Sequence, residues 1–121
     1  MKVMVIDDSE ISLALTSSAL KTAGIQVVGL SSPLGVAAAL VLEKPDLVLL
    51  DMDMPALSGE KAASILKRQR SLRHFKVFLY SDRDEDALAA AVARCGANGF
   101  LRKTHDLGWL VSEVRRLAAQ P

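Results

Sequence analysis

Five short apolar runs alternate with five longer segments in which apolar residues recur at helical spacing. The apolar runs predict strands at residues 2–6, 25–30, 46–50, 75–80 and 97–101. The periodic segments predict helices at residues 10–23, 33–44, 59–69, 84–95 and 106–119. Strands that alternate with helices in this way predict parallel pairing through right-handed crossovers. The expected fold is therefore an α/β, doubly wound three-layer sandwich with a five-stranded parallel sheet.

Residues that start or stop helices support several of these boundaries. Ser9 can cap the first helix, and Gly24 can end it. Pro33 is expected in the first turn of the second helix, and Pro45 lies just past its end. The first two predicted helices are thus bounded by residues that suit their ends.

The composition bounds the class of protein. At 121 residues the sequence is expected to form one domain over residues 1–121, and one cysteine excludes an internal disulfide. The net charge of +1 gives no electrostatic case for binding nucleic acid or a membrane. The N-terminus lacks the pattern of a signal peptide, so we expect a cytoplasmic location.

Polar residues follow four of the predicted strands where those strands end: Asp7 with Asp8, Asp51, Ser81 and Lys103. Because parallel strands place their carboxyl ends on one edge, these side chains are expected to meet there. Three neighbouring aspartates repel one another, and a hard divalent cation such as Mg²⁺ relieves that repulsion. The lysine adds a positive charge that can pair with Asp51, and the serine can donate to a phosphoryl oxygen. The set predicts that Asp51 is a phosphoryl acceptor.

These motifs resemble those of response-regulator receiver domains, and the resemblance covers the whole chain. The matching segments are Val3-Met4-Val5-Ile6-Asp7-Asp8-Ser9, Leu49-Leu50-Asp51-Met52-Asp53-Met54-Pro55, Ser81 and Phe100-Leu101-Arg102-Lys103. Gly59 matches the glycine of the loop after the acceptor. The resemblance implies a flavodoxin-like receiver fold with strand order 2-1-3-4-5.

The resemblance also implies a role in a two-component system. A sensor histidine kinase or histidine phosphotransfer protein would phosphorylate Asp51, with Mg²⁺ held by Asp7, Asp8, Asp51 and the backbone carbonyl of Asp53. Lys103 and Ser81 would assist, and Ser81 with Phe100 would form the switch. The fourth helix, fifth strand and fifth helix would then present an altered face to a downstream protein. Such a domain is not an enzyme acting on other molecules, because it catalyses only its own phosphotransfer and dephosphorylation.

Three residues depart from the family's usual pattern, and a fourth is expected on the surface. Thr104 replaces the usual proline after the lysine, so we expect either a trans Lys103–Thr104 peptide or a strained cis bond held by its surroundings. Asp53 and Asp82 add negative charge beside the acceptor, which predicts slow phosphorylation by small anionic donors. Trp109 is expected to point outward from the last helix and is a candidate partner residue.

Two alternatives remain open from the sequence. Asp51-Met52-Asp53 also resembles the nucleophile-x-acid signature of haloacid-dehalogenase-type phosphatases, although Asp7 and Asp8 do not fit the order of motifs in those enzymes. A pseudo-receiver that binds partners without phosphorylation is the second alternative, because of Thr104, Asp53 and Asp82.

Overall fold

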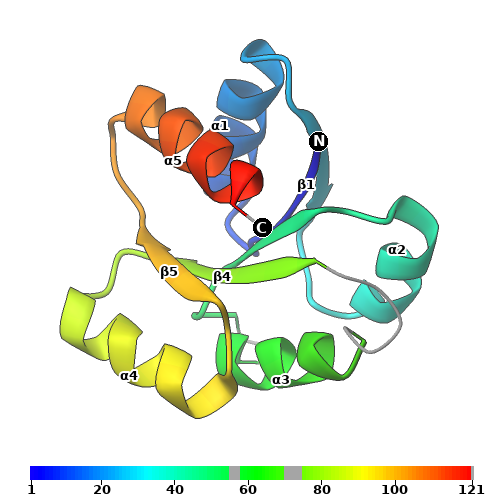
Figure 1. Cartoon of the computed structure of the whole chain (residues 1–121), viewed down its shortest axis with the longest axis vertical. Coiled ribbons are helices and arrows are strands. Elements are labelled where there is room, and N and C mark those ends of the chain that lie inside the picture. Colours follow the sequence, from blue (N-terminus) through cyan, green and yellow to red (C-terminus); the bar gives the residue numbers. More distant parts are fainter. Residues whose placement is uncertain (55–57, 70–74, 121) are drawn as a thin grey trace.

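The computed structural model describes residues 1–54, 58–69 and 75–120, and strands and helices alternate through these segments (Figure 1). The strands are β1 (Lys2–Ile6), β2 (Gln26–Leu30), β3 (Leu47–Leu50), β4 (Lys76–Ser81) and β5 (Gly99–Arg102). The helices are α1 (Glu10–Thr22), α2 (Val36–Glu43), α3 (Gly59–Gln69), α4 (Glu85–Cys95) and α5 (Leu107–Ala119).

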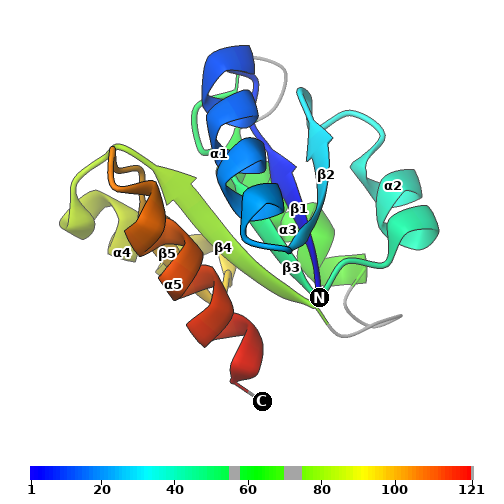
Figure 2. The ribbon, with the colours of Figure 1, turned by 90° about the horizontal axis from the view of Figure 1, so that it is seen from above.

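The strands form one parallel sheet in the order β2-β1-β3-β4-β5. Helices α1 and α5 cover one face of the sheet, and α2, α3 and α4 lie on the other (Figure 1). Seen from above, α1 and α2 lie on either side of the edge strand β2 (Figure 2). The doubly wound, flavodoxin-like fold and its strand order are therefore confirmed.

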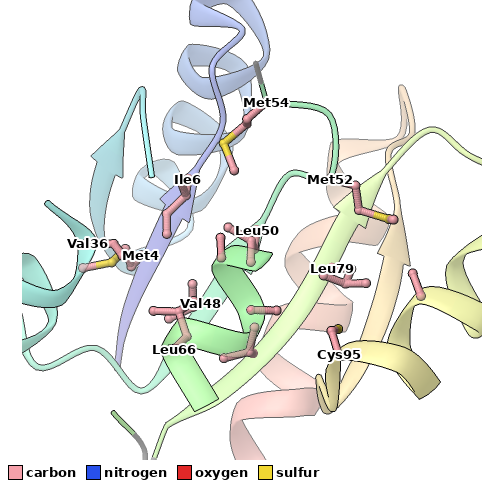
Figure 3. Packing of buried hydrophobic residues seen from close by; sticks show 14 of the residues in the cluster. Met4, Ile6, Val36, Val48, Leu50, Met52, Met54, Leu66, Leu79 and Cys95 are labelled. Atoms are coloured by element: carbon pink, nitrogen blue, oxygen red, sulfur yellow. The ribbon is translucent and has the colours of Figure 1, made fainter. Parts of the chain in front are cut away.

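Each face of the sheet carries its own apolar core, because successive strand residues point to opposite sides. Met4, Ile6, Val48, Leu50 and Leu79 face α2, α3 and α4 (Figure 3). The core beneath α1 and α5 contains the alternate residues of the same strands, namely Val3, Val5, Leu47, Leu49, Phe78, Tyr80 and Leu101. Burial on both faces explains why β3 reads as an unbroken apolar run. Within the described residues, no helix combines the length and apolar character needed to cross a bilayer.

The second helix begins later than the sequence predicts. The Leu34 amide donates to Ser32 Oγ at 3.1 Å and the Val36 amide donates to the Pro33 carbonyl at 3.2 Å, so this segment forms turns. Gly35 precedes α2 with a φ of 80°, a conformation that favours glycine and interrupts helical geometry. The expectation that Pro33 lies in the first helical turn is therefore wrong.

Candidate functional site

The aspartates that follow β1 and β3 converge at the carboxyl edge of the sheet. Asp7, Asp8 and Asp51 each offer a carboxylate oxygen, and these oxygens lie within 4.8 Å of one another. Asp7 is fully buried and Asp51 is 5% exposed, whereas Asp8 is exposed. The expected convergence of these three carboxylates is observed, and the group opens to solvent on the side of Asp8.

Backbone amides orient the two buried carboxylates. The Ser9 amide donates to Asp7 Oδ1 at 3.0 Å, and the Asp53 amide donates to Asp51 Oδ1 at 3.3 Å. Ser9 also caps α1 as expected, because its Oγ accepts from the Ser12 amide at 3.2 Å. The turns after β1 and β3 thus hold one oxygen of each carboxylate.

Lys103 brings a positive charge into this group from the end of β5. Its Nζ donates to Asp7 Oδ2 at 2.9 Å and lies 3.9 Å from Asp51 Oδ1. The Lys103 amide donates to the Ser81 carbonyl at 2.7 Å, which continues the pairing of β4 and β5. The peptide to Thr104 is trans, one of the two expected forms. From the sequence we expected that Lys103 can pair with Asp51, but its closer partner in the structure is Asp7.

The carboxylates differ in their proton affinity because Lys103 is shared unequally. Burial raises the pKa of Asp51 to about 6; the attraction of Lys103 opposes this rise, and the charge of Asp7 adds to it. Burial also acts to raise the pKa of Asp7, but hydrogen bonds from Lys103, Ser12 and Ser9 outweigh it and leave the pKa lowered. For Lys103, burial is outweighed by Asp7 and Asp51, so its pKa is raised and it stays charged. Asp51 is therefore the buried carboxylate whose charge is poorly compensated.

A divalent cation fits this arrangement. The three converging groups are carboxylate oxygens, the ligands that Mg²⁺ prefers. Lys103 pairs with Asp7 and Asp51 and brings a single positive charge to a group of three carboxylates, so a further positive charge would lower the energy of the charged site. Asp7, Asp8 and Asp51 are the side chains placed to hold such an ion.

The predicted switch residues occupy β4 and β5. Ser81 is the last residue of β4, 1% exposed, and its Oγ accepts from the Arg83 amide at 3.2 Å. Phe100 lies on β5, half-buried against the core under α3 and α4. Pro55 of the predicted acceptor loop lies outside the described residues, and Gly59 is the first residue of α3.

The family model for the response regulator receiver domain matches residues 3–115. The chain belongs to the response regulator receiver domain family. Among curated proteins, it is 32% identical to the response regulator GacA of Pseudomonas aeruginosa over 98% of its own length. That alignment covers 55% of GacA, so the chain spans about half the length of this relative.

Solved structures agree with this membership. The signal receiver domain of the putative response regulator NarL from Mycobacterium tuberculosis has a TM-score of 0.84 at 28% identity, over 99% of this chain and 97% of that one. The Vibrio cholerae chemotaxis protein CheY4 has a TM-score of 0.86 at 21% identity, over 95% and 96% of the two chains. The match of the receiver-domain family model over residues 3–115 favours a receiver of two-component signalling over the phosphatase alternative.

One side of this receiver carries a groove of about 580 Å³ along β5 and α5. Phe100, Arg102, Thr104 and Trp109 are among the residues that line it. The Trp109 side chain is 40% exposed, in keeping with its expected outward position. The lining contains acidic as well as basic side chains, so the groove offers apolar surface with charges of both signs beside the predicted switch.

Two features of the receiver's site were missed in the sequence. Arg83 pairs with the carboxylate of Asp53, so the extra charge at that position is partly neutralised. Tyr80 lies under Lys103 and hydrogen-bonds to Thr16. Because successive residues of β4 point to opposite faces of the sheet, Tyr80 lies on the same face as Asp7 and Asp51. This alternation could have identified Tyr80 from the sequence.

Proposed function

We propose that this receiver accepts a phosphoryl group on Asp51 from a phosphohistidine of a sensor histidine kinase or histidine phosphotransfer protein. A carboxylate oxygen of Asp51 forms the new P–O bond. The P–N bond breaks, and its electron pair returns to the imidazole nitrogen, which takes up a proton. The observation that carries the proposal is the convergence of the buried Asp51 with Asp7, Asp8 and Lys103 at one edge of the sheet.

The roles of the residues follow from charge. Asp7, Asp8, Asp51 and the backbone carbonyl of Asp53 would hold Mg²⁺, which when bound supplies positive charge against the phosphoryl oxygens. Lys103 Nζ lies 3.9 Å from Asp51 Oδ1. It pairs with a phosphoryl oxygen once Asp51 carries the phosphoryl group. In the later hydrolysis, water attacks phosphorus, and Asp51 leaves as the carboxylate. The domain thus catalyses only its own phosphorylation and dephosphorylation.

Ser81 and Phe100 form the proposed switch. The Ser81 hydroxyl accepts from the Arg83 amide, which leaves its own proton to donate to a phosphoryl oxygen on Asp51. Moving toward that oxygen draws the end of β4 inward and changes the packing available to Phe100 on β5. The result is a shift between two packings of the α4–β5–α5 face.

That face, with Trp109 at its rim, is the proposed docking surface for a downstream protein. The net charge of +1 gives no reason to invoke direct binding to nucleic acid or membrane. We place the domain, residues 1–121, in the cytoplasm, where the kinase domains of two-component systems act.

Intact-mass spectrometry after incubation with acetyl phosphate and Mg²⁺ tests the proposal. The chain should gain the mass of one phosphoryl group, and Asp51→Asn should gain none. A wild-type chain that gains no phosphoryl group from acetyl phosphate or from a histidine donor, and binds no beryllofluoride with Mg²⁺, would instead support the pseudo-receiver alternative.

A further inference from the structure

Tyr80 is a buried aromatic residue directly below the site. It is 2% exposed and precedes Ser81 on β4. Its side chain belongs to the apolar core under α1 and α5, on the same face of the sheet as Asp7, Asp51 and Lys103. That core also contains the residues two positions before each of these three, namely Val5, Leu49 and Leu101. The Tyr80 ring therefore belongs to the layer of buried side chains that lies next to the charged groups.

The face of this ring meets the Lys103 ammonium. Lys103 Nζ lies 5.5 Å from the centroid of the Tyr80 ring and 2.9 Å from Asp7 Oδ2. A cation within about 6 Å of an aromatic centroid is attracted by the negative face of the ring, most strongly where water is excluded. The Lys103 side chain is 23% exposed, so the contact is largely shielded from solvent. The ammonium is held between a carboxylate and a ring.

A hydroxyl on α1 anchors the other end of the ring. Tyr80 OH and Thr16 Oγ1 lie 3.3 Å apart, and Thr16 is 2% exposed. Burial raises the pKa of Tyr80, so the phenol stays neutral and keeps its hydrogen bond and its π face. The backbone of β4 therefore fixes one end of the Tyr80 side chain, and Thr16 on α1 holds its hydroxyl end.

We infer that Tyr80 is a positioning residue for Lys103, with Thr16 as its anchor. The inference rests on the proposed function, in which Lys103 must meet a phosphoryl oxygen on Asp51. Lysine has a flexible four-carbon stem, so its ammonium stays in a single position only if other groups hold it there. Asp7 is also a proposed ligand of Mg²⁺, and a carboxylate that binds the ion holds Lys103 less strongly. The ring is a contact that Lys103 keeps in that state.

The test compares Tyr80→Leu with Tyr80→Phe. The leucine variant removes the π face, whereas the phenylalanine variant keeps it and deletes only the hydroxyl. Tyr80→Leu should slow the phosphorylation of Asp51 by acetyl phosphate roughly two- to thirty-fold, the factor that corresponds to a cation–π attraction. Tyr80→Phe should retain most of the wild-type rate. Phe78→Leu is the matched control, because Phe78 is a buried aromatic on the same strand and face; it should lose stability but keep its rate.

A nuclear magnetic resonance readout makes the test independent of phosphorylation. The Tyr80 ring current should shift the Lys103 ε-methylene signal upfield in wild type and in Tyr80→Phe, but not in Tyr80→Leu. Lys103→Met identifies the signal. Thr16→Val and Tyr80→Phe delete the same hydrogen bond between Thr16 and Tyr80, so both variants should keep the upfield shift at a reduced size. If Tyr80→Leu does not fold, Tyr80→Met replaces it, since it also fills the space without a ring.

The inference is overturned by any of three results. The first is an absent ring-current shift in wild type. The second is a Tyr80→Phe variant as slow as Tyr80→Leu, and the third is a Phe78→Leu variant slowed to the same degree. A wild-type chain that takes up no phosphoryl group but shows the expected shift would instead refute the proposed function and leave the placement of Lys103 intact.

Discussion

Replacing Asp51 with asparagine should stabilise the metal-free fold at neutral pH. The substitution removes a charge from a side chain that is only 7% exposed. It keeps an oxygen in place to accept the Asp53 amide, now 3.3 Å from Oδ1. Lys103 keeps its closer partner, Asp7, at 2.9 Å. Asp51→Asn therefore removes the poorly compensated charge and leaves the neighbouring contacts available.

The size of the effect follows from the pKa of Asp51. Its pKa rises from an ordinary 3.8 to about 6 in the folded chain. At about 1.4 kcal/mol for each pKa unit, the ionised group costs the fold about 3 kcal/mol above pH 6. Because a raised pKa means that the native state binds the proton more tightly, this cost disappears as the pH falls from 6 toward 3.8. At pH 4 only about 0.5 kcal/mol remains.

Urea unfolding in the presence of a chelator measures this difference. Asp51→Asn should exceed wild type by about 3 kcal/mol at pH 7.5, and the gap should shrink to about 0.5 kcal/mol at pH 4. Asp82→Asn is the control, since it removes one exposed carboxylate near the same edge and should change stability by less than about 0.5 kcal/mol. Equal stabilities at pH 7.5, or a gap that does not vary with pH, would refute the reasoning.

Three further predictions concern the apolar core, the approach of phosphodonors to Asp51, and the α4–β5–α5 face. Leu79→Ala should lower the free energy of unfolding by about 2–5 kcal/mol in urea titrations, because Leu79 is fully buried in the larger core; a loss below 1 kcal/mol would contradict that packing. Asp82→Ala should speed the labelling of Asp51 by acetyl phosphate, since it removes negative charge from the path of an anionic donor, and an unchanged rate in intact-mass time courses would end that hypothesis. Trp109 emission should change when Mg²⁺ and beryllofluoride are added, because the indole shares a groove with Phe100; the change should be absent in Asp51→Asn, and a constant wild-type spectrum would argue against a switch at this face.

The fold could be predicted because its signals are local and agree with one another. The apolar run Leu47-Val48-Leu49-Leu50 allows little except a strand buried on both faces. Asp84 caps α4 by accepting from the Ala87 amide at 2.8 Å, and Gly96 ends that helix with a φ of 76°. The predicted start of α2 was wrong because proline at position 33 suits a β-turn as well as the first turn of a helix. Only the neighbouring Gly35 decides between them.

The composition of the site was predictable, whereas its pairing was not. The rule that parallel strands share one carboxyl edge is enough to bring Asp7, Asp51 and Lys103 together. Which aspartate Lys103 approaches depends on a difference of 1.0 Å between distances of 2.9 and 3.9 Å. Such a difference is set by side-chain packing. Tyr80 and Thr16 contribute to that packing from positions far apart in the chain, which no local pattern in the sequence links.

The cost of the buried Asp51 charge to the fold and the proposed chemistry of the site have one electrostatic origin. A buried carboxylate with little compensation weakens the fold, and the same feature favours any ligand that brings positive charge to it. A ligand that binds only the folded chain stabilises that chain by RT ln(1 + [L]/Kd), so a tighter ligand stabilises it more. Saturating Mg²⁺ should therefore raise the stability of wild type more than that of Asp51→Asn and narrow the gap between them at pH 7.5. If Mg²⁺ widened the gap instead, Asp51 would not be one of its ligands, and the proposed role of the three carboxylates would fail.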